Sequence, residues 1–207
     1  MKLKIIILII ICLGFSALAA ISLVPKKVNE NALSFDKEPF INPKIIHDLT
    51  TWLADTGNQV VAIDLLDAQN SNRYFCELKI EHIRNKNPII SYQDEDGETF
   101  AYQLIGKTET NIYVLRTCEY GQGSGVFEEL LFVKLEKEKF INYSPNTASL
   151  NLTSERLVIK KLGSIPLGDR YDGEIKIEGD KLFIEKDENN FSGVFNKDTV
   201  IKLDYDI

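Results

Sequence analysis

The chain has few of the residues on which most metal sites depend. Its 207 residues include two histidines that are not spaced as a pair, which excludes a histidine-rich metal site. Twelve glycines are too few for a collagen-like chain. Lysine and arginine number 24 against 31 aspartates and glutamates. Because nonspecific nucleic-acid binding requires clustered basic residues, we expect no nucleic-acid partner.

The chain does contain enough apolar material for a buried core. Hydrophobic residues make up 44% of the sequence, which excludes an intrinsically disordered protein. A chain of this length suits one domain, even after removal of a short leader. The formal net charge of −7 favours basic partners, although charge steers an encounter more than it fixes the identity of the partner.

Residues 1–24 carry the strongest pattern in the sequence. Two lysines precede the unbroken apolar run Ile5–Phe15, and Ala17 and Ala19 occupy the two positions that a signal peptidase recognises. This pattern predicts a cleaved signal peptide. The alternative is an uncleaved anchor, because the apolar character continues to Val24 and is long enough to cross a bilayer.

Both alternatives place the remainder of the chain outside the cytoplasm. The protein is then periplasmic or secreted, or it is a single-pass membrane protein with its domain outside the cytoplasm. In either case we expect contact with the membrane only through the N-terminal segment. An oxidising compartment favours a disulfide between Cys76 and Cys118, and the alternative is two buried free thiols. Neither cysteine has a partner at zinc-ligand spacing.

Beyond the leader, residues 25–41 are polar with scattered prolines, which is typical of a linker. Asn42 and Pro43 are typical of a helix start, since asparagine caps exposed amides and proline tolerates the first helical position. An apolar stripe then follows at helical spacing and predicts an amphipathic helix that ends near Gly57 and packs on a larger element. The stripe consists of Ile45, Ile46, Leu49, Trp52 and Leu53.

From Val60 onward, short β-branched and aromatic runs alternate with turn residues, which predicts antiparallel strands. An Asn- and Ser-rich stretch at residues 142–153 is the one candidate seam, but the short remainder favours completion of the same sheets. We therefore expect residues 42–207 to form one mainly β domain, a sandwich or barrel of about ten strands. The predicted strands include Val60–Leu66, Arg73–Ile83, Ile89–Tyr92, Thr99–Ile105, Ile112–Glu119, Val126–Leu135 and Thr199–Ile207.

Two loops are the candidate binding residues. The first contains Gly121, Gly123, Ser124 and Gly125, lacks the ending of a phosphate-binding loop, and does not match the G-x-S-x-G pattern of a serine nucleophile. Glycine nevertheless lets a partner approach the backbone closely. The second is the acidic tip with Asp94 and Asp96, where Asp96 and Gly97 predict a hairpin turn between two strands. This tip does not match a calcium loop. No cofactor is expected.

These patterns favour an exported, non-catalytic binding or interaction domain that contacts a protein or another component of the cell envelope. One alternative is a hydrolase of envelope polymers that uses a pair of carboxylates. The other is a structural accessory that the uncleaved leader holds at the membrane. No motif in the sequence identifies a catalytic residue.

Overall fold

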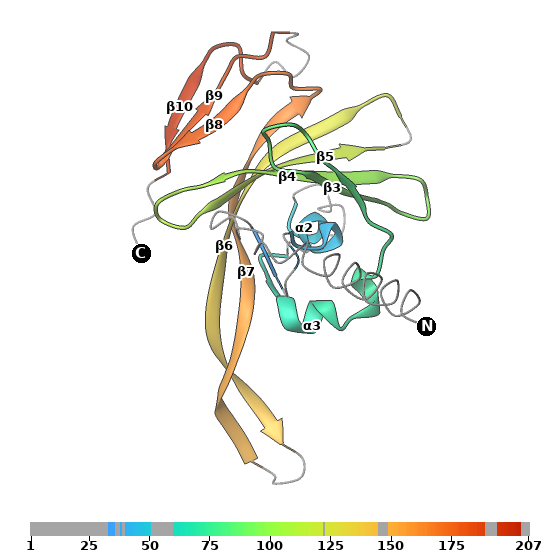
Figure 1. Ribbon diagram of the computed structural model, residues 1–207, viewed down its shortest axis with the longest axis vertical. Helices are drawn as coiled ribbons and strands as arrows, with labels where there is room; N and C mark the ends of the chain where they lie inside the picture. Colours follow the sequence, from blue (N-terminus) through green and yellow to red (C-terminus); the bar gives the residue numbers. More distant parts are fainter. Residues whose placement is uncertain are drawn as a thin grey trace, which may run out of the picture. The chain divides into compact units, whose positions relative to one another are not determined.

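The computed structural model describes residues 33–35, 38, 40–50, 60–121, 123–144, 149–188 and 194–203. The predicted leader at residues 1–24 lies outside them. The described residues form ten strands and a few short helices (Figure 1). Seven strands pair in the order β1-β7-β6-β5-β4-β3-β2, and three pair in the order β10-β9-β8. All of these pairs are antiparallel, so the prediction of a mainly β fold is confirmed.

The seven-stranded sheet is open, with β1 and β2 at its two edges. The predicted alternative of a closed barrel therefore does not occur among the described strands, and two sheets are present instead. The large sheet contains β1 (Ala62–Asp64), β2 (Lys79–Glu81), β3 (Ile89–Gln93), β4 (Thr99–Lys107), β5 (Tyr113–Tyr120), β6 (Val126–Ser144) and β7 (Ser149–Asp169), and the small sheet contains β8 (Ile175–Glu178), β9 (Lys181–Ile184) and β10 (Thr199–Lys202).

The large sheet is buried on both faces. Successive residues of a strand point to opposite faces, so Leu131 and Leu130 on β6 belong to different cores. The core that includes Leu131 packs one face of the sheet against short helices, and we call it the helix-side core. The core that includes Leu130 packs the other face against β9 residues such as Leu182, and we call it the sheet-side core. Because both faces are covered, β6 carries an uninterrupted apolar run over residues 130–133, where a half-exposed strand would alternate.

Helix α2 (Pro43–Asp48) begins where the sequence predicts a helix start. The side chain of Asn42 accepts a hydrogen bond of 2.9 Å from the amide of Lys44, and Pro43 occupies the first helical position. The apolar stripe of this helix includes Ile46, which has no exposed surface. Trp52, Leu53 and Gly57, which belong to the predicted longer helix, lie outside the described residues.

Two predicted strands are interrupted by helical turns, and the interruption shapes the candidate site. The carboxylate of Asp64 accepts hydrogen bonds from the amides of Leu66 and Asp67, which ends β1 and starts α3 (Leu65–Gln69) within the run predicted as a single strand. The 3-10 helix η2 (Asn72–Tyr74) occupies the start of the predicted strand at residues 73–83. Only β2 remains of that strand.

The segment before α2 is attached to the sheet through Tyr102 of β4. Leu33 and Ile41 fall in the stretch expected to be a linker, yet each is no more than 2% exposed in the helix-side core. The amide of Ile41 donates a hydrogen bond of 3.0 Å to the Tyr102 hydroxyl, and this hydroxyl donates one of 2.5 Å to the carbonyl of Ile41. One side chain of the sheet therefore fixes this segment in place.

Strands β6 and β7, of 19 and 21 residues, extend past the rest of the sheet as a two-stranded ribbon (Figure 1). β1 pairs with β7 only at residues 158–160. Farther along, the described residues of β6 and β7 pair with each other alone, as far as Ser144 and Ser149. We call residues 137–144 and 149–157 the arm. The described part of the stretch that the sequence marked as a seam, residues 142–144 and 149–153, thus belongs to this arm.

Ion pairs link the two strands where the arm begins. Lys160 Nζ lies 2.8 Å from Glu136 and 2.5 Å from Glu138, and Arg156 lies 3.1 Å from Glu138. Hydrogen bonds from Lys160 hold the pKa of both glutamates below the usual range. A depressed folded pKa stabilises the folded state above the unfolded pKa, and this stabilisation is lost as the pH falls through the folded pKa.

We therefore expect the arm to open locally in acid. Hydrogen-exchange protection of the amides at residues 136–140 should fall between about pH 5 and pH 3, while protection at the centre of β4 and β5 is retained. Concentrated salt should produce a similar loss at neutral pH, because these pairs are partly exposed and screened. A Lys160→Met variant should be poorly protected at every pH. Equal acid sensitivity in this variant and the wild type would show that the ion pairs of Lys160 do not cause the opening.

Candidate functional site

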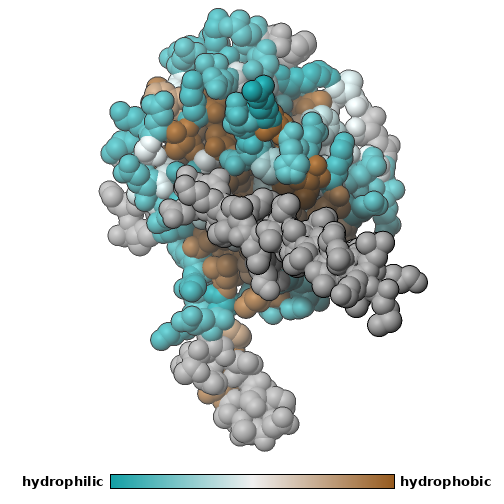
Figure 2. Space-filling view, in the orientation of Figure 1, coloured by the Kyte–Doolittle hydropathy of each residue, from teal (hydrophilic) through white to brown (hydrophobic). Residues whose placement is uncertain are grey.

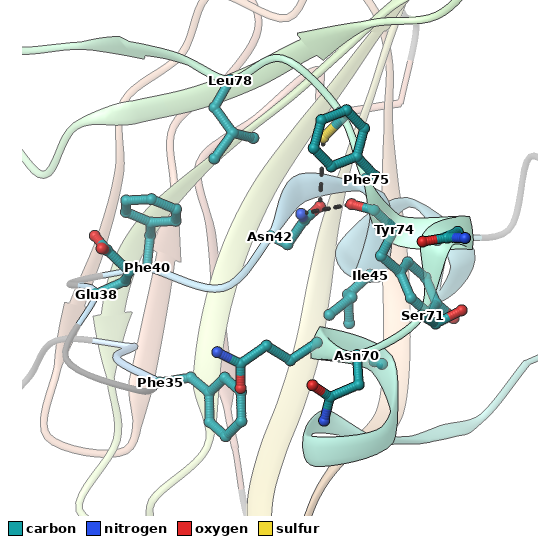
Figure 3. Close-up of a pocket in the computed structure, with 14 residues that line it drawn as sticks. Phe35, Glu38, Phe40, Asn42, Ile45, Asn70, Ser71, Tyr74, Phe75 and Leu78 are labelled. Carbon is teal, nitrogen blue, oxygen red and sulfur yellow. Dashed lines mark hydrogen bonds between the residues drawn. The ribbon is translucent and has the colours of Figure 1, made fainter.

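A groove of about 490 Å³ lies on the helix side of the large sheet (Figure 3). Its walls come from the segment before α2, from α2 itself, from the end of α3, from η2 and from the chain that leads into β2. Figure 3 shows that apolar side chains from these separate segments surround the opening. They are Phe35, Phe40, Ile45, Phe75 and Leu78.

Several polar side chains of the groove are engaged within the protein. Asn42 donates a hydrogen bond of 2.8 Å to the carbonyl of Tyr74, and it also lies 3.7 Å from the Cys76 sulfur. Asn70 donates to the carbonyl of Leu66. The Tyr74 hydroxyl donates to Asp48, and burial followed by this contact raises the pKa of Tyr74 to about 12. These groups hold the walls in place, so the free surface of the groove is mainly apolar and aromatic.

One ring at the mouth of the groove is unusually exposed. Phe75 is 83% exposed, although aromatic side chains are normally at least half buried in a folded domain. Leu78 and Ile80 continue the apolar surface along β2 and are 37% and 42% exposed. Ile80 pairs with the buried Ile90 and so faces the helix side of the sheet. Together these three side chains form an apolar strip next to the groove.

The strip follows the edge of the sheet. Among the described strands, β2 pairs only with β3, so the backbone groups along its outer side have no neighbouring strand. Its charged residues, Lys79 and Glu81, alternate with Ile80 and therefore project from the other face. An edge strand that ends beside an apolar groove is the arrangement that accepts an added strand from another polypeptide.

The two loops predicted as binding residues lie together, but away from the groove. Gly121, Gly123, Ser124 and Gly125 connect β5 to β6, and the acidic tip connects β3 to β4. Because Thr99 pairs with both Gln93 and Tyr120, the two loops are neighbours at one end of the sheet. None of these residues lines the groove. Whether they bind a ligand remains a prediction.

The acidic tip has a local structural role. Asp94 accepts hydrogen bonds from the amides of Asp96 and Glu98, at 3.0 and 2.8 Å, and so uses one carboxylate oxygen to close the turn. Gly97 has a φ of +88°, which an L side chain rarely adopts. In the part of the chain that the structure describes, no three histidine, cysteine or acidic side chains are grouped to hold a metal ion.

The predicted disulfide between Cys76 and Cys118 is wrong, because both cysteines are free thiols. Cys118 pairs with Ala101 and Glu128, so it faces the side of the sheet opposite to Tyr102 and the helices. Cys76 instead packs against the helix-side core. The sheet itself therefore separates the two sulfurs. Burial raises the pKa of Cys118 to about 11, and a thiol that stays protonated is a poor nucleophile.

A second polar cluster fastens α2 to the sheet. His47 lies 2.6 Å from the Tyr92 hydroxyl through Nδ1, stacks on Phe100, and brings Nε2 to 3.8 Å from Glu119. The contacts from Tyr92 through His47 to Glu119 resemble a proton relay. Burial, however, raises the pKa of the Tyr92 hydroxyl, and none of the four residues lines the groove. The cluster therefore packs the helix onto the sheet.

The groove does not assemble the carboxylate pair that the alternative of a hydrolase requires. Glu38 is the one carboxylate among its described lining residues. On the opposite face, a smaller cavity of about 290 Å³ includes Glu128, but this glutamate is paired with Arg116 at 2.5 Å. Burial, acting against Arg116, raises the pKa of Glu128.

Sequence patterns did not reveal the groove, because its walls come from segments between Phe35 and Leu78 that meet only in the folded chain. The one available signal was the apolar pair Phe75 and Leu78 next to a short strand rich in charge. Within the described part of the chain, no helix is both long and apolar enough to cross a bilayer. Comparison with protein-family models, with curated proteins and with solved structures found no match.

Proposed function

We propose that the chain is an exported, non-catalytic binding domain that captures an extended, apolar segment of a partner protein. The segment lies in the groove and pairs with the outer edge of β2. The observation that carries this proposal is the exposed ring of Phe75, which stands at the mouth of an apolar groove and beside an unpaired edge strand. Export is supported by the leader of basic, apolar and small residues at positions 1–24.

Strand addition explains how such a site combines affinity with selectivity. The backbone of the added segment would supply hydrogen bonds to β2, and these are independent of sequence. Every second side chain of an extended segment points to the same side. The segment would therefore place alternate apolar side chains against Leu78, Ile80 and the groove. Basic flanking residues suit this acidic chain, because they increase the rate of encounter.

A Phe75→Ala variant tests this function. We expect peptides selected from a random display library on the wild-type protein to show apolar residues at alternate positions. The variant should bind them about tenfold more weakly or worse, because the ring is a central aromatic anchor. Its stability should change by less than about 0.5 kcal/mol, since the ring is 83% exposed. Fluorescence anisotropy measures the affinity, and hydrogen exchange should show new protection at residues 79–81.

The matched control is Phe127→Ala, which removes another exposed ring outside the groove. This variant should bind the selected peptides as the wild type does. Equal losses in the two variants would contradict the site, and so would selected peptides that leave the amides of β2 unprotected. A library that yields no enriched peptide would contradict the function as a whole.

A further inference from the structure

The arm combines two features that the groove does not explain. At about 3.3 Å per residue, the eight residues of β6 beyond the end of β1, residues 137–144, span roughly 25 Å. The sequence has no charged residue from position 140 to position 154, the longest uncharged run after residue 25. The described part of this run, residues 140–144 and 149–154, lies at the far end of the arm. The chain as a whole is 27% charged, so the end of the arm differs sharply from the remaining surface.

Apolar side chains are exposed within this uncharged run. Leu150 is 69% exposed, and Ile141 is 59% exposed at an irregularity in the pairing of β6 with β7. Phe140 precedes Ile141 and lies under the guanidinium of Arg156, with 6.0 Å between the charge and the ring centroid. A hairpin that served only to connect two strands would not need exposed apolar side chains so far from either core.

The charge around the uncharged run is reversed relative to the chain. Residues 134–161 contain six lysines and arginines and three glutamates, a net charge of +3, whereas the full chain carries −7. Glu136 and Glu138 are engaged with Lys134, Lys160 and Arg156. Figure 2 shows hydrophilic side chains over this part of the arm.

Two of the lysines are available for a partner. Lys137 and Lys139 are exposed and make no ion pair with any side chain that the structure describes. They alternate with Glu136 and Glu138, so they project from the opposite face of the ribbon. This face of the arm therefore presents two lysines without an ion pair and one glutamate, Glu155, across from Lys139. The exposed Ile141 follows at the irregularity in the pairing.

We propose that the end of the arm docks on an anionic lipid surface. The uncharged end enters the boundary between headgroups and acyl chains, and Lys137 and Lys139 bind the headgroup phosphates. Basic residues beside an apolar element are the usual means of such binding, and each lysine near an anionic surface contributes roughly fivefold to the affinity. The outer backbone groups of a two-stranded ribbon are unpaired, so the arm stays at this boundary and does not span the hydrocarbon.

An environment-sensitive fluorophore on a Leu150→Cys variant of the full chain tests docking. With vesicles of phosphatidylcholine and phosphatidylglycerol, in a ratio of about three to one, the emission should rise and shift to shorter wavelength. Vesicles of phosphatidylcholine alone should have little effect. In the same variant, Lys137→Gln with Lys139→Gln should raise the lipid concentration for half-maximal change about 25-fold. The wild-type chain, labelled in the same way, shows how much of the fluorescence change comes from label on the native cysteines.

The control position is Val200→Cys on the small sheet, where the parent residue is 58% exposed. A fluorophore there should not respond to vesicles. Because every variant carries the same leader, binding through the leader alone would leave the probe at position 150 unchanged and would overturn the proposal. A fluorescence response that does not depend on phosphatidylglycerol would also overturn it. The same holds for an emission shift that occurs without lipid and grows with protein concentration, because this would indicate that a second copy of the chain covers the arm. None of these outcomes bears on peptide binding at the groove.

Discussion

Substitution of Arg116 by methionine is expected to lower the free energy of unfolding by about 3 to 5 kcal/mol, as measured by urea denaturation. Arg116 of β5 donates a hydrogen bond of 2.5 Å to Glu128 of β6, whose side chain is only 8% exposed. It also donates to the carbonyl of Tyr171 and lies over the ring of this tyrosine. The substitution leaves a buried carboxylate without its cation and removes a link between β5 and the chain that leads to the small sheet.

The size of this effect depends on Glu128, and this dependence provides the control. Replacing both residues, Arg116→Met with Glu128→Leu, removes the uncompensated charge and should recover a large part of the lost stability. Arg170→Met removes a more exposed arginine that pairs with Asp169, and it should cost less than about 1 kcal/mol. A double variant as unstable as Arg116→Met alone would show that the carboxylate is not the cause.

The stability lost in the Arg116→Met variant should depend on pH in a specific direction. Burial already holds the pKa of Glu128 above the usual range, and Arg116 opposes this shift, so loss of Arg116 raises the pKa further. A group with a raised folded pKa favours the folded state below its unfolded pKa and loses this contribution as the pH rises through the folded pKa. The deficit of Arg116→Met should therefore shrink between about pH 7 and pH 5. A deficit that is constant with pH would contradict this assignment.

The sequence predicted the parts of the fold that depend on local chemistry. The start of α2 follows from the cap by Asn42, and the turn at Asp94 follows from an aspartate and a glycine between two apolar runs. The start of α3 was missed although Asp64 is a good capping residue, because it lies inside an apolar run that also suits a strand. Local patterns favour both structures there, and only the packing of Leu65 and Ala68 in the helix-side core decides between them.

Properties that depend on which face of the sheet a residue occupies were beyond the sequence. The disulfide was inferred from the expected oxidising compartment and from the two cysteines beyond the leader, but neither reveals that the sheet lies between Cys76 and Cys118. The burial of β6 on both faces was visible in its continuous apolar run, yet the covering element cannot be read from the run itself. Prediction of the groove needs both residue type and long-range packing. The apolar character of its lining residues can be read from the sequence, but these residues meet only in the folded chain.

The second large effect concerns the residue that holds one wall of the groove. We expect Tyr102→Phe to lower the free energy of unfolding by about 2 to 4 kcal/mol in urea denaturation. The Tyr102 hydroxyl is both acceptor for the amide and donor to the carbonyl of Ile41, and Ile41 is 1% exposed. Its removal leaves two buried backbone groups without a partner, at about 1 to 3 kcal/mol each, partly offset by relaxation of the chain.

Tyr113→Phe is the matched control, because Tyr113 is a partly exposed residue and loss of its hydroxyl should change stability by less than about 0.5 kcal/mol. Hydrogen exchange at the amide of Ile41 should accelerate in Tyr102→Phe and not in the control. Tyr102 does not line the groove, but the segment that it fixes carries Phe40 into the wall. The variant should therefore also weaken peptide capture, although it removes no contact with the peptide. Capture at full affinity by Tyr102→Phe would show that the wall formed by this segment is not needed for binding.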